Sequence, residues 1–165
     1  MAKATIVFSH WSTMIEGLNA SPNEFFDAVE QAVQEKQLEK AKHSRINWKE
    51  GGLLSAKREY LRIRRQEYAF DVCGAPFGNG FFVSWWLGEV PSGLLAFLIS
   101  IPLIGPLIER SARPQTYYRI DTASMFQSLV HSAVLQVIDG MTNNQGVRAL
   151  PETERKPEMR SFFSD

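Results

Sequence analysis

Residues 61–87 read LRIRRQEYAFDVCGAPFGNGFFVSWWL, and this stretch decides the fold. Apolar and charged side chains alternate over residues 61–64, and the same period of two continues over residues 68–72. The glycine-rich residues 74–80 then lead into a continuous apolar run over residues 81–87. A period of two is typical of strands with one buried face, and short connections make consecutive strands antiparallel. The stretch therefore predicts three consecutive antiparallel strands.

A fourth strand is predicted on the N-terminal side of this stretch. Ile46 and Trp48 alternate with polar residues, and Gly51 and Gly52 follow as turn residues. The four segments together predict an antiparallel meander, in which each strand pairs with the next one along the chain.

A helix is predicted to precede the meander, over residues 22–40. Ser21, Pro22 and Glu24 form the pattern of a capping box, in which the serine and the glutamate satisfy the first free amide groups of a helix. The apolar residues that follow recur at helical spacing and predict a buried stripe of Phe25, Phe26, Val29 and Val33.

The C-terminal third predicts a short strand and a second helix. Residues 116–120, Thr-Tyr-Tyr-Arg-Ile, look like one more short strand, and Asp121 or Thr122 is expected to cap the helix that follows. The predicted apolar face of this helix consists of Phe126, Leu129, Val130, Ala133, Val134, Val137, Ile138 and Met141.

These elements predict an α+β fold with an antiparallel sheet of about four to five strands and two main helices packed on one of its faces. We expect a single α+β domain over residues 1–150 and a polar C-terminal tail over residues 151–165, with a short helical turn near residues 158–163. An apolar insert at residues 90–108, broken by proline and glycine, interrupts the domain.

The composition is that of an ordinary folded domain with an uneven distribution of charge. The chain has 165 residues, of which 44% are apolar, and its 18 basic and 18 acidic side chains cancel. The net charge is −4 over residues 1–35, +7 over residues 36–65 and −3 over residues 66–165. A disordered, collagen-like or disulfide-rich chain is excluded, and the single cysteine, Cys73, suggests a reducing, cytoplasmic setting.

The insert is the strongest functional signal in the sequence. Residues 90–108 carry no charge, but Pro102, Gly105 and Pro106 would break a helix there. The longest uninterrupted piece would rise about 12 Å, against about 30 Å for the hydrocarbon core of a bilayer. We therefore expect a hairpin that dips into one leaflet. Its membrane-facing or interface residues are predicted to be Trp85, Trp86, Leu94, Phe97, Ile101, Leu103 and Ile104.

Arginines beside the insert and on one strand are candidates for binding anions, above all lipid phosphates. They are Arg58, Arg62, Arg64, Arg65, Arg110 and Arg113. A solvated outer face of the sheet would explain the arginines on the strand equally well. Nucleic acid is the weaker reading, because the overall charge is balanced and no recognition motif follows.

The sequence assigns no catalytic residue, metal site or cofactor. His131 on the second helix and Cys73 beside the glycine-rich loop are the two groups that an undetected enzyme would use. The three histidines are scattered and lack the spacing of metal ligands.

Three functions remain open on this basis. The leading one is a non-enzymatic binding or scaffold protein that associates with a membrane surface through the hairpin and a basic sheet face. The alternative is a soluble homo-oligomer or partner-binding module with the hairpin buried at the interface. The third is an enzyme with a pocket near His131 or Cys73.

Overall fold

The computed structural model describes residues 6–49, 57–90 and 116–159. The elements in chain order are β1 (Ile6–Glu16), α1 (Pro22–Glu35), β2 (Lys42–Lys49), β3 (Lys57–Arg65), β4 (Tyr68–Phe77), β5 (Gly80–Glu89), α4 (Tyr117–Gln145), a 3-10 turn η1 (Glu152–Glu154) and β6 (Glu158–Met159). The α+β prediction is confirmed.

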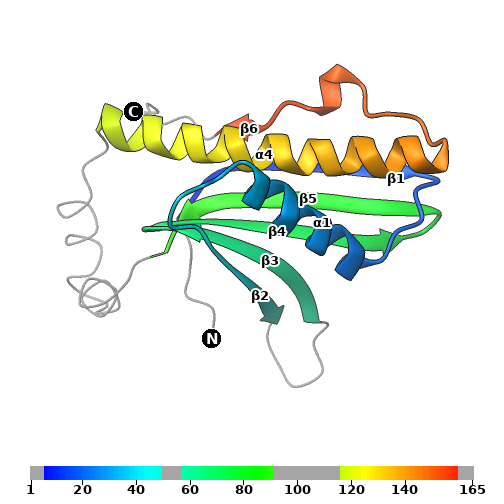
Figure 1. The fold of residues 1–165 in the computed structure, drawn as a ribbon, viewed down its shortest axis with the longest axis horizontal. Coiled ribbons are helices and arrows are strands. Elements are labelled where there is room, and N and C mark those ends of the chain that lie inside the picture. The colour runs from blue at the N-terminus through cyan, green and yellow to red at the C-terminus, as the bar shows by residue number, and fades with distance from the viewer. Residues whose placement is uncertain (1–5, 50–56, 91–115, 160–165) are drawn as a thin grey trace.

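The strands form one antiparallel sheet in the order β2-β3-β4-β5-β1-β6. The predicted meander corresponds to β2 through β5, where each strand pairs with the next. Both helices lie on the same side of the sheet, with the long α4 running beside β5 and β1 (Figure 1). We call the helix-covered side the inner face and the opposite side the outer face.

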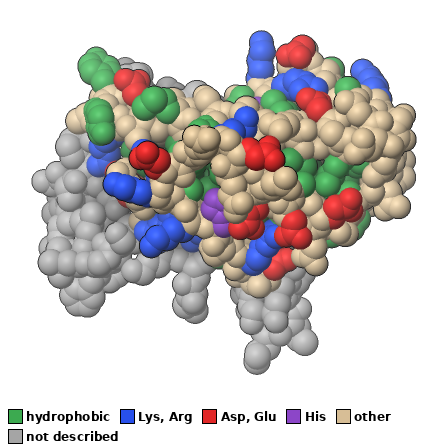
Figure 2. Space-filling view, viewed as in Figure 1, with side chains coloured by type: hydrophobic (Ala, Val, Ile, Leu, Met, Phe, Trp, Pro, Cys, Tyr) green, Lys and Arg blue, Asp and Glu red, His purple; other side chains and the backbone are tan. Residues whose placement is uncertain are grey.

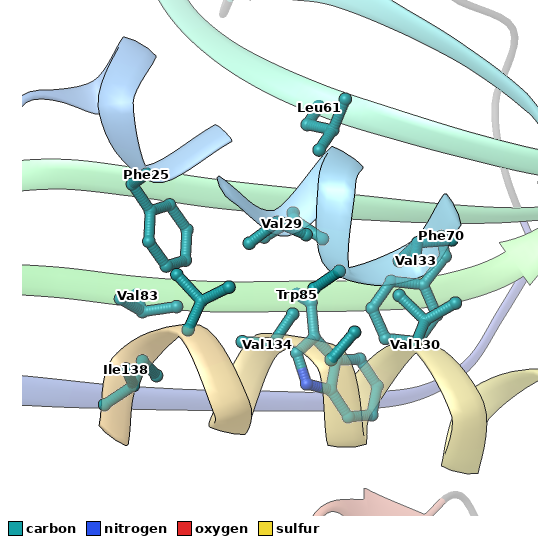
Figure 3. Close-up of a cluster of buried hydrophobic side chains, with 14 of the residues drawn as sticks. Phe25, Val29, Val33, Leu61, Phe70, Val83, Trp85, Val130, Val134 and Ile138 are labelled. Atoms are coloured by element: carbon teal, nitrogen blue, oxygen red, sulfur yellow. The ribbon is translucent and has the colours of Figure 1, made fainter. Parts of the chain in front are cut away.

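The hydrophobic core lies between the inner face and the two helices. Leu61, Phe70, Val83 and Trp85 project from the strands toward α1 and α4, and all four are fully buried (Figure 3). The helices contribute Phe25, Val29, Val33, Val130, Val134 and Ile138 to the same cluster. The predicted apolar stripe of α1 is therefore confirmed, and most of the stripe predicted for α4 is buried as well.

The start of α1 follows the capping pattern, but its end comes earlier than predicted. The Ser21 hydroxyl accepts a hydrogen bond from the Glu24 amide at 3.1 Å, as expected of an N-cap. The helix stops at Glu35 because Gln37 and Lys40 have positive φ angles of 53° and 62°, which end the helical path. The expectation of a helix to residue 40 was wrong at that end.

The predicted strand over residues 116–120 is wrong, because this segment is the first turn of α4. The true N-cap is Thr116, whose side chain accepts from the Arg119 amide, and not Asp121 or Thr122. The Thr122 hydroxyl instead donates to the carbonyl of Tyr118 at 2.7 Å inside the helix. Among the described residues no strand pairs with this segment, and the Thr116 cap begins a helix here instead.

Two strands were not predicted. β1 lies between β5 and β6 and pairs with β5 over almost its whole length. Trp11, Thr13 and Ile15 of β1 are buried and alternate with exposed residues, so a period of two was present in the sequence.

The described part of the predicted C-terminal tail, residues 151–159, packs against the domain. β6 pairs with Ser9 and His10 of β1, and the Arg155 guanidinium makes two hydrogen bonds to Asp139 of α4, at 3.0 and 2.6 Å. Residues 158–159 are a strand, so the predicted helical turn is not found there, and residues 160–165 lie outside the described residues.

Candidate functional site

The candidate site is the end of the domain at which the apolar insert leaves the sheet and rejoins the fold. Glu89, at the end of β5, forms an ion pair with Arg119 in the first turn of α4. The Tyr68 hydroxyl donates to the Arg119 carbonyl at 3.1 Å, and Tyr68 pairs with Glu89 across the sheet. The end of β5 and the start of α4, between which the insert lies in the sequence, are therefore held together.

The backbone at this end is tied to the turn between β3 and β4. The Val90 amide donates to the Glu67 carbonyl at 2.8 Å, and the Arg64 guanidinium reaches the Val90 carbonyl at 3.5 Å. Arg64 also donates to the carbonyl of Gln66 at 3.3 Å. Val90, the first residue of the insert, thus has both backbone polar groups satisfied.

The pKa values of Arg119 and Tyr68 are shifted by burial and by neighbouring groups. Burial opposes the charge of Arg119, but the hydrogen bond to Glu89, the charge of that carboxylate and the contact with Tyr68 together outweigh burial and raise the pKa of the guanidinium. Burial of the phenol, together with the Glu67 carboxylate, raises the pKa of Tyr68. Around neutral pH, Arg119 therefore stays charged and the Tyr68 phenol keeps its proton, which it donates to the Arg119 carbonyl.

Large apolar side chains are exposed at the beginning of α4. Tyr117, Tyr118 and Met125 are 83%, 80% and 65% exposed, which is far more than any core residue. Figure 2 shows hydrophobic side chains gathered over this part of α4. These side chains bury little surface against the described residues, so packing within this part of the fold does not explain them. Exposed apolar side chains that cluster in this way mark a surface that meets a partner or a membrane.

Of the predicted interface residues, only Trp85 and Trp86 lie in the described residues, and they do not share a surface. Trp85 is fully buried in the core, so the prediction that it faces a membrane or partner was wrong. Trp86 is 41% exposed on the outer face, where it stacks on His10 at 4.8 Å between ring centres. Leu94, Phe97, Ile101, Leu103 and Ile104 lie outside the described residues.

The predicted anion-binding arginines divide into different environments. Arg62 is buried on the outer face and makes two hydrogen bonds to Asp71, at 2.7 and 2.6 Å, so its charge is already paired within the sheet. Arg58 is exposed, and Arg64 and Arg65 are half-buried near the end of β3. Arg110 and Arg113 lie outside the described residues.

His131 and Cys73 lie on opposite faces of the sheet and cannot act together. Both ring nitrogens of His131 have close partners on the inner side, Trp85 Nε1 at 3.0 Å and the Arg155 carbonyl at 2.7 Å. Cys73 is fully buried on the outer side, and burial raises the pKa of its thiol. Neither group is arranged as a nucleophile or a free base.

A surface cleft between the end of α1 and β2 was not predicted. It has a volume of about 480 Å³ and is lined by Glu30, Val33, Gln34, Gln37, Leu38, Glu39, Ala41 and His43. His43 Nδ1 lies 3.3 Å from Glu30 Oε1. The sequence contained no spacing signal for it, since its walls come from a helix, a loop and a strand.

Two further findings concern only the residues that the structure describes. Their histidines, cysteine and carboxylates include no group of three placed to hold a metal ion. None of their helices combines the length and the apolarity needed to cross a bilayer.

Comparison of this chain with family models, with curated proteins and with solved structures finds no match to any of them.

Proposed function

We propose that this protein is a non-catalytic module that binds the surface of anionic membranes through the end of the domain from which the apolar insert emerges. The observation that supports the proposal is the ion pair between Glu89, which directly precedes the insert, and Arg119 in the first turn of α4. The exposed Tyr117 and Tyr118 directly precede Arg119 in the chain.

The chemistry of this end suits the boundary between water and lipid. Residues 90–108 have no charge, and tyrosine rings favour the headgroup level of a bilayer. Arg64 and Arg65 lie at the same end, because Arg65 pairs with Tyr68 and Tyr68 pairs with Glu89. Each such cation near an anionic leaflet contributes on the order of 1 kcal/mol.

The non-catalytic part of the proposal rests on His131 and Cys73. The two groups are on opposite faces of the sheet, and His131 has a partner on each ring nitrogen. The single cysteine agrees with a cytoplasmic protein that is peripheral to the membrane.

Vesicle flotation of the intact chain tests the proposal. We expect the protein to float with vesicles that contain phosphatidylserine and much less with vesicles of phosphatidylcholine alone. Replacing Tyr117 and Tyr118 by serine is expected to lower the partition coefficient by roughly tenfold, because two aromatic side chains leave the interface.

Phe77→Ser is the matched control. Phe77 is 70% exposed at the opposite end of β4, about 30 Å from Tyr68 at the usual rise per residue of a strand. The proposal fails if no vesicle is bound, or if Phe77→Ser lowers binding as much as the tyrosine replacements do. A defined oligomer that ignores vesicles and dissociates on Phe97→Asp would establish the protein-interface alternative instead.

A further inference from the structure

Two buried ring N–H groups hold the segment 151–156 against the domain. Trp11 Nε1 on β1 donates to the Glu154 carbonyl at 2.6 Å, and His131 Nε2 on α4 lies 2.7 Å from the Arg155 carbonyl. Adjacent carbonyls of the segment are thus bound by neighbouring rings, which meet edge to face at 5.2 Å. We call residues 151–156 the strap.

The partners of His131 determine its protonation state. The indole nitrogen of Trp85 can only donate, so His131 Nδ1, at 3.0 Å from it, must accept. Nε2 therefore carries the hydrogen and donates to the Arg155 carbonyl. The ring is neutral, and a further proton can add only at Nδ1.

A proton at Nδ1 would point directly at the N–H of Trp85. Trp85 is fully buried and packs against Phe70 at 4.6 Å, so it has no room to turn away. The imidazole must rotate instead, and this rotation takes Nε2 away from the Arg155 carbonyl. The strap then loses its bond to α4 at that position.

Among the charged groups in and against the strap, Arg155 disfavours a positive charge on the His131 ring. The strap contributes Arg155, which is paired with Asp139 of α4 and lies 3.8 Å from Glu152. Glu154 is bound by the Thr13 hydroxyl of β1 at 3.1 Å. Trp85 on β5 and Trp11 on β1 bring no charge.

Burial is the main cause that lowers the pKa of His131. The bond to the Arg155 carbonyl raises the pKa and the guanidinium charge of Arg155 lowers it, with a net value below the ordinary 6.5. Neutrality at neutral pH thus follows from the surroundings of the ring as well as from its hydrogen bonds.

We propose that protonation of His131 releases the strap, so that this segment is a pH-sensitive latch over Trp11 and His131. The release is confined to residues 151–156. At β6, His10 Nε2 lies 3.2 Å from Glu158 Oε2, so this end of the C-terminal segment has its own contact to β1 that does not involve His131.

Hydrogen exchange of the Glu154 and Arg155 amides tests the latch. Both amides are bonded within the strap, to Pro151 and Glu152 carbonyls. After correction for the intrinsic effect of pH, their opening constant is expected to rise by up to about tenfold per pH unit below about 6.5. Amides of β4 and β5 are expected to keep their protection over the same range.

Two variants distinguish the contributions of His131 and His10 to the pH dependence of strap opening. His131→Gln, which cannot titrate, is expected to remove the pH dependence of strap opening, whereas His10→Gln is expected to keep it. A titration of the wild-type chain by NMR needs no variant, and the His131 ring signals should change together with the Arg155 amide. Strap protection that is independent of pH, or loss of protection in β4 and β5 in parallel with the strap, would overturn the proposal.

Discussion

Trp85 and Trp86 are neighbours in the sequence but belong to the two different faces of the sheet. Trp85 is fully buried on the inner face, where its indole nitrogen donates to His131. Trp86 is 41% exposed on the outer face and stacks on His10 with 14° between the ring planes. Because successive side chains of β5 point to opposite faces, Trp85 and Trp86 cannot form one aromatic surface.

The two faces differ in how they are stabilised. The inner face is apolar and covered by α1 and α4, so it depends on packing. The outer face holds the buried ion pair of Arg62 and Asp71, with side chains 11% and 8% exposed. Substitutions at adjacent positions should therefore have different effects according to face.

The largest expected difference is between the two tryptophans themselves. Trp85→Ala should lower the free energy of unfolding by about 3–5 kcal/mol, because it leaves a cavity in the core and removes the partner of His131. Trp86→Ala should cost less than about 1 kcal/mol, since the side chain is partly solvated. Urea denaturation followed by circular dichroism measures the free energy of unfolding of both variants. Similar losses of stability would show that the two faces do not differ at this position.

Breaking the ion pair on the outer face should have the next largest effect. Asp71→Leu leaves the buried Arg62 guanidinium without its carboxylate and should cost about 3 kcal/mol. Replacing both residues by leucine should restore most of that loss, because no uncompensated charge remains. A double variant as unstable as Asp71→Leu would mean that Arg62 is held mainly by its other contacts.

A smaller difference in stability between the two faces is expected at the neighbouring residues Gly74 and Ala75. A Cβ atom on Gly74 would lie 2.4 Å from the Phe25 ring, so Gly74→Ala should overpack the inner face and cost about 1–3 kcal/mol. Ala75 is half-buried on the outer face, and Ala75→Ser should change stability by no more than about 0.5 kcal/mol. Thermal unfolding of the two variants decides whether packing at this point is as tight as the distance indicates.

The smallest expected effect is the dependence of stability on pH. The pKa of His131 is lowered in the fold, so the unfolded chain binds more protons below its ordinary value of 6.5. Stability should therefore fall with decreasing pH, by up to about 1.4 kcal/mol per unit, until the lowered pKa is passed. Denaturation at several pH values checks this, and His131→Gln should lack this part of the slope.

Local patterns in the sequence predicted most of the elements and missed those that depend on a distant partner. The meander from β2 to β5 and the capped start of α1 are confirmed, because alternation and capping involve residues close together in the chain. β1 was not predicted although its residues alternate with a period of two, and its pairing with β5 and β6, both far along the chain, has no local signal. The strand expected at residues 116–120 failed because no sheet edge pairs with it.

The candidate site was predicted only in part. The absence of charge over residues 90–108 is visible in the sequence, but the meeting of Glu89 with Arg119, thirty positions apart, is not. Tyr117 and Tyr118 were read as strand residues, so their exposure at the start of α4 was missed. The cluster around His131 draws on α4, β5 and the strap, and no local pattern could bring these three together.

The alternation along the strands, the start of α1 and the residues of a strand that share a face can be predicted from the amino-acid sequence, because these properties follow from the geometry of a few neighbouring residues. Which face of the sheet is covered depends on the folded chain. Burial depends on what packs against a strand, and α1 and α4 cover the side of Trp85 and not that of Trp86. For the same reason, only the folded chain could pair Arg62 with Asp71 and hold the strap against His131.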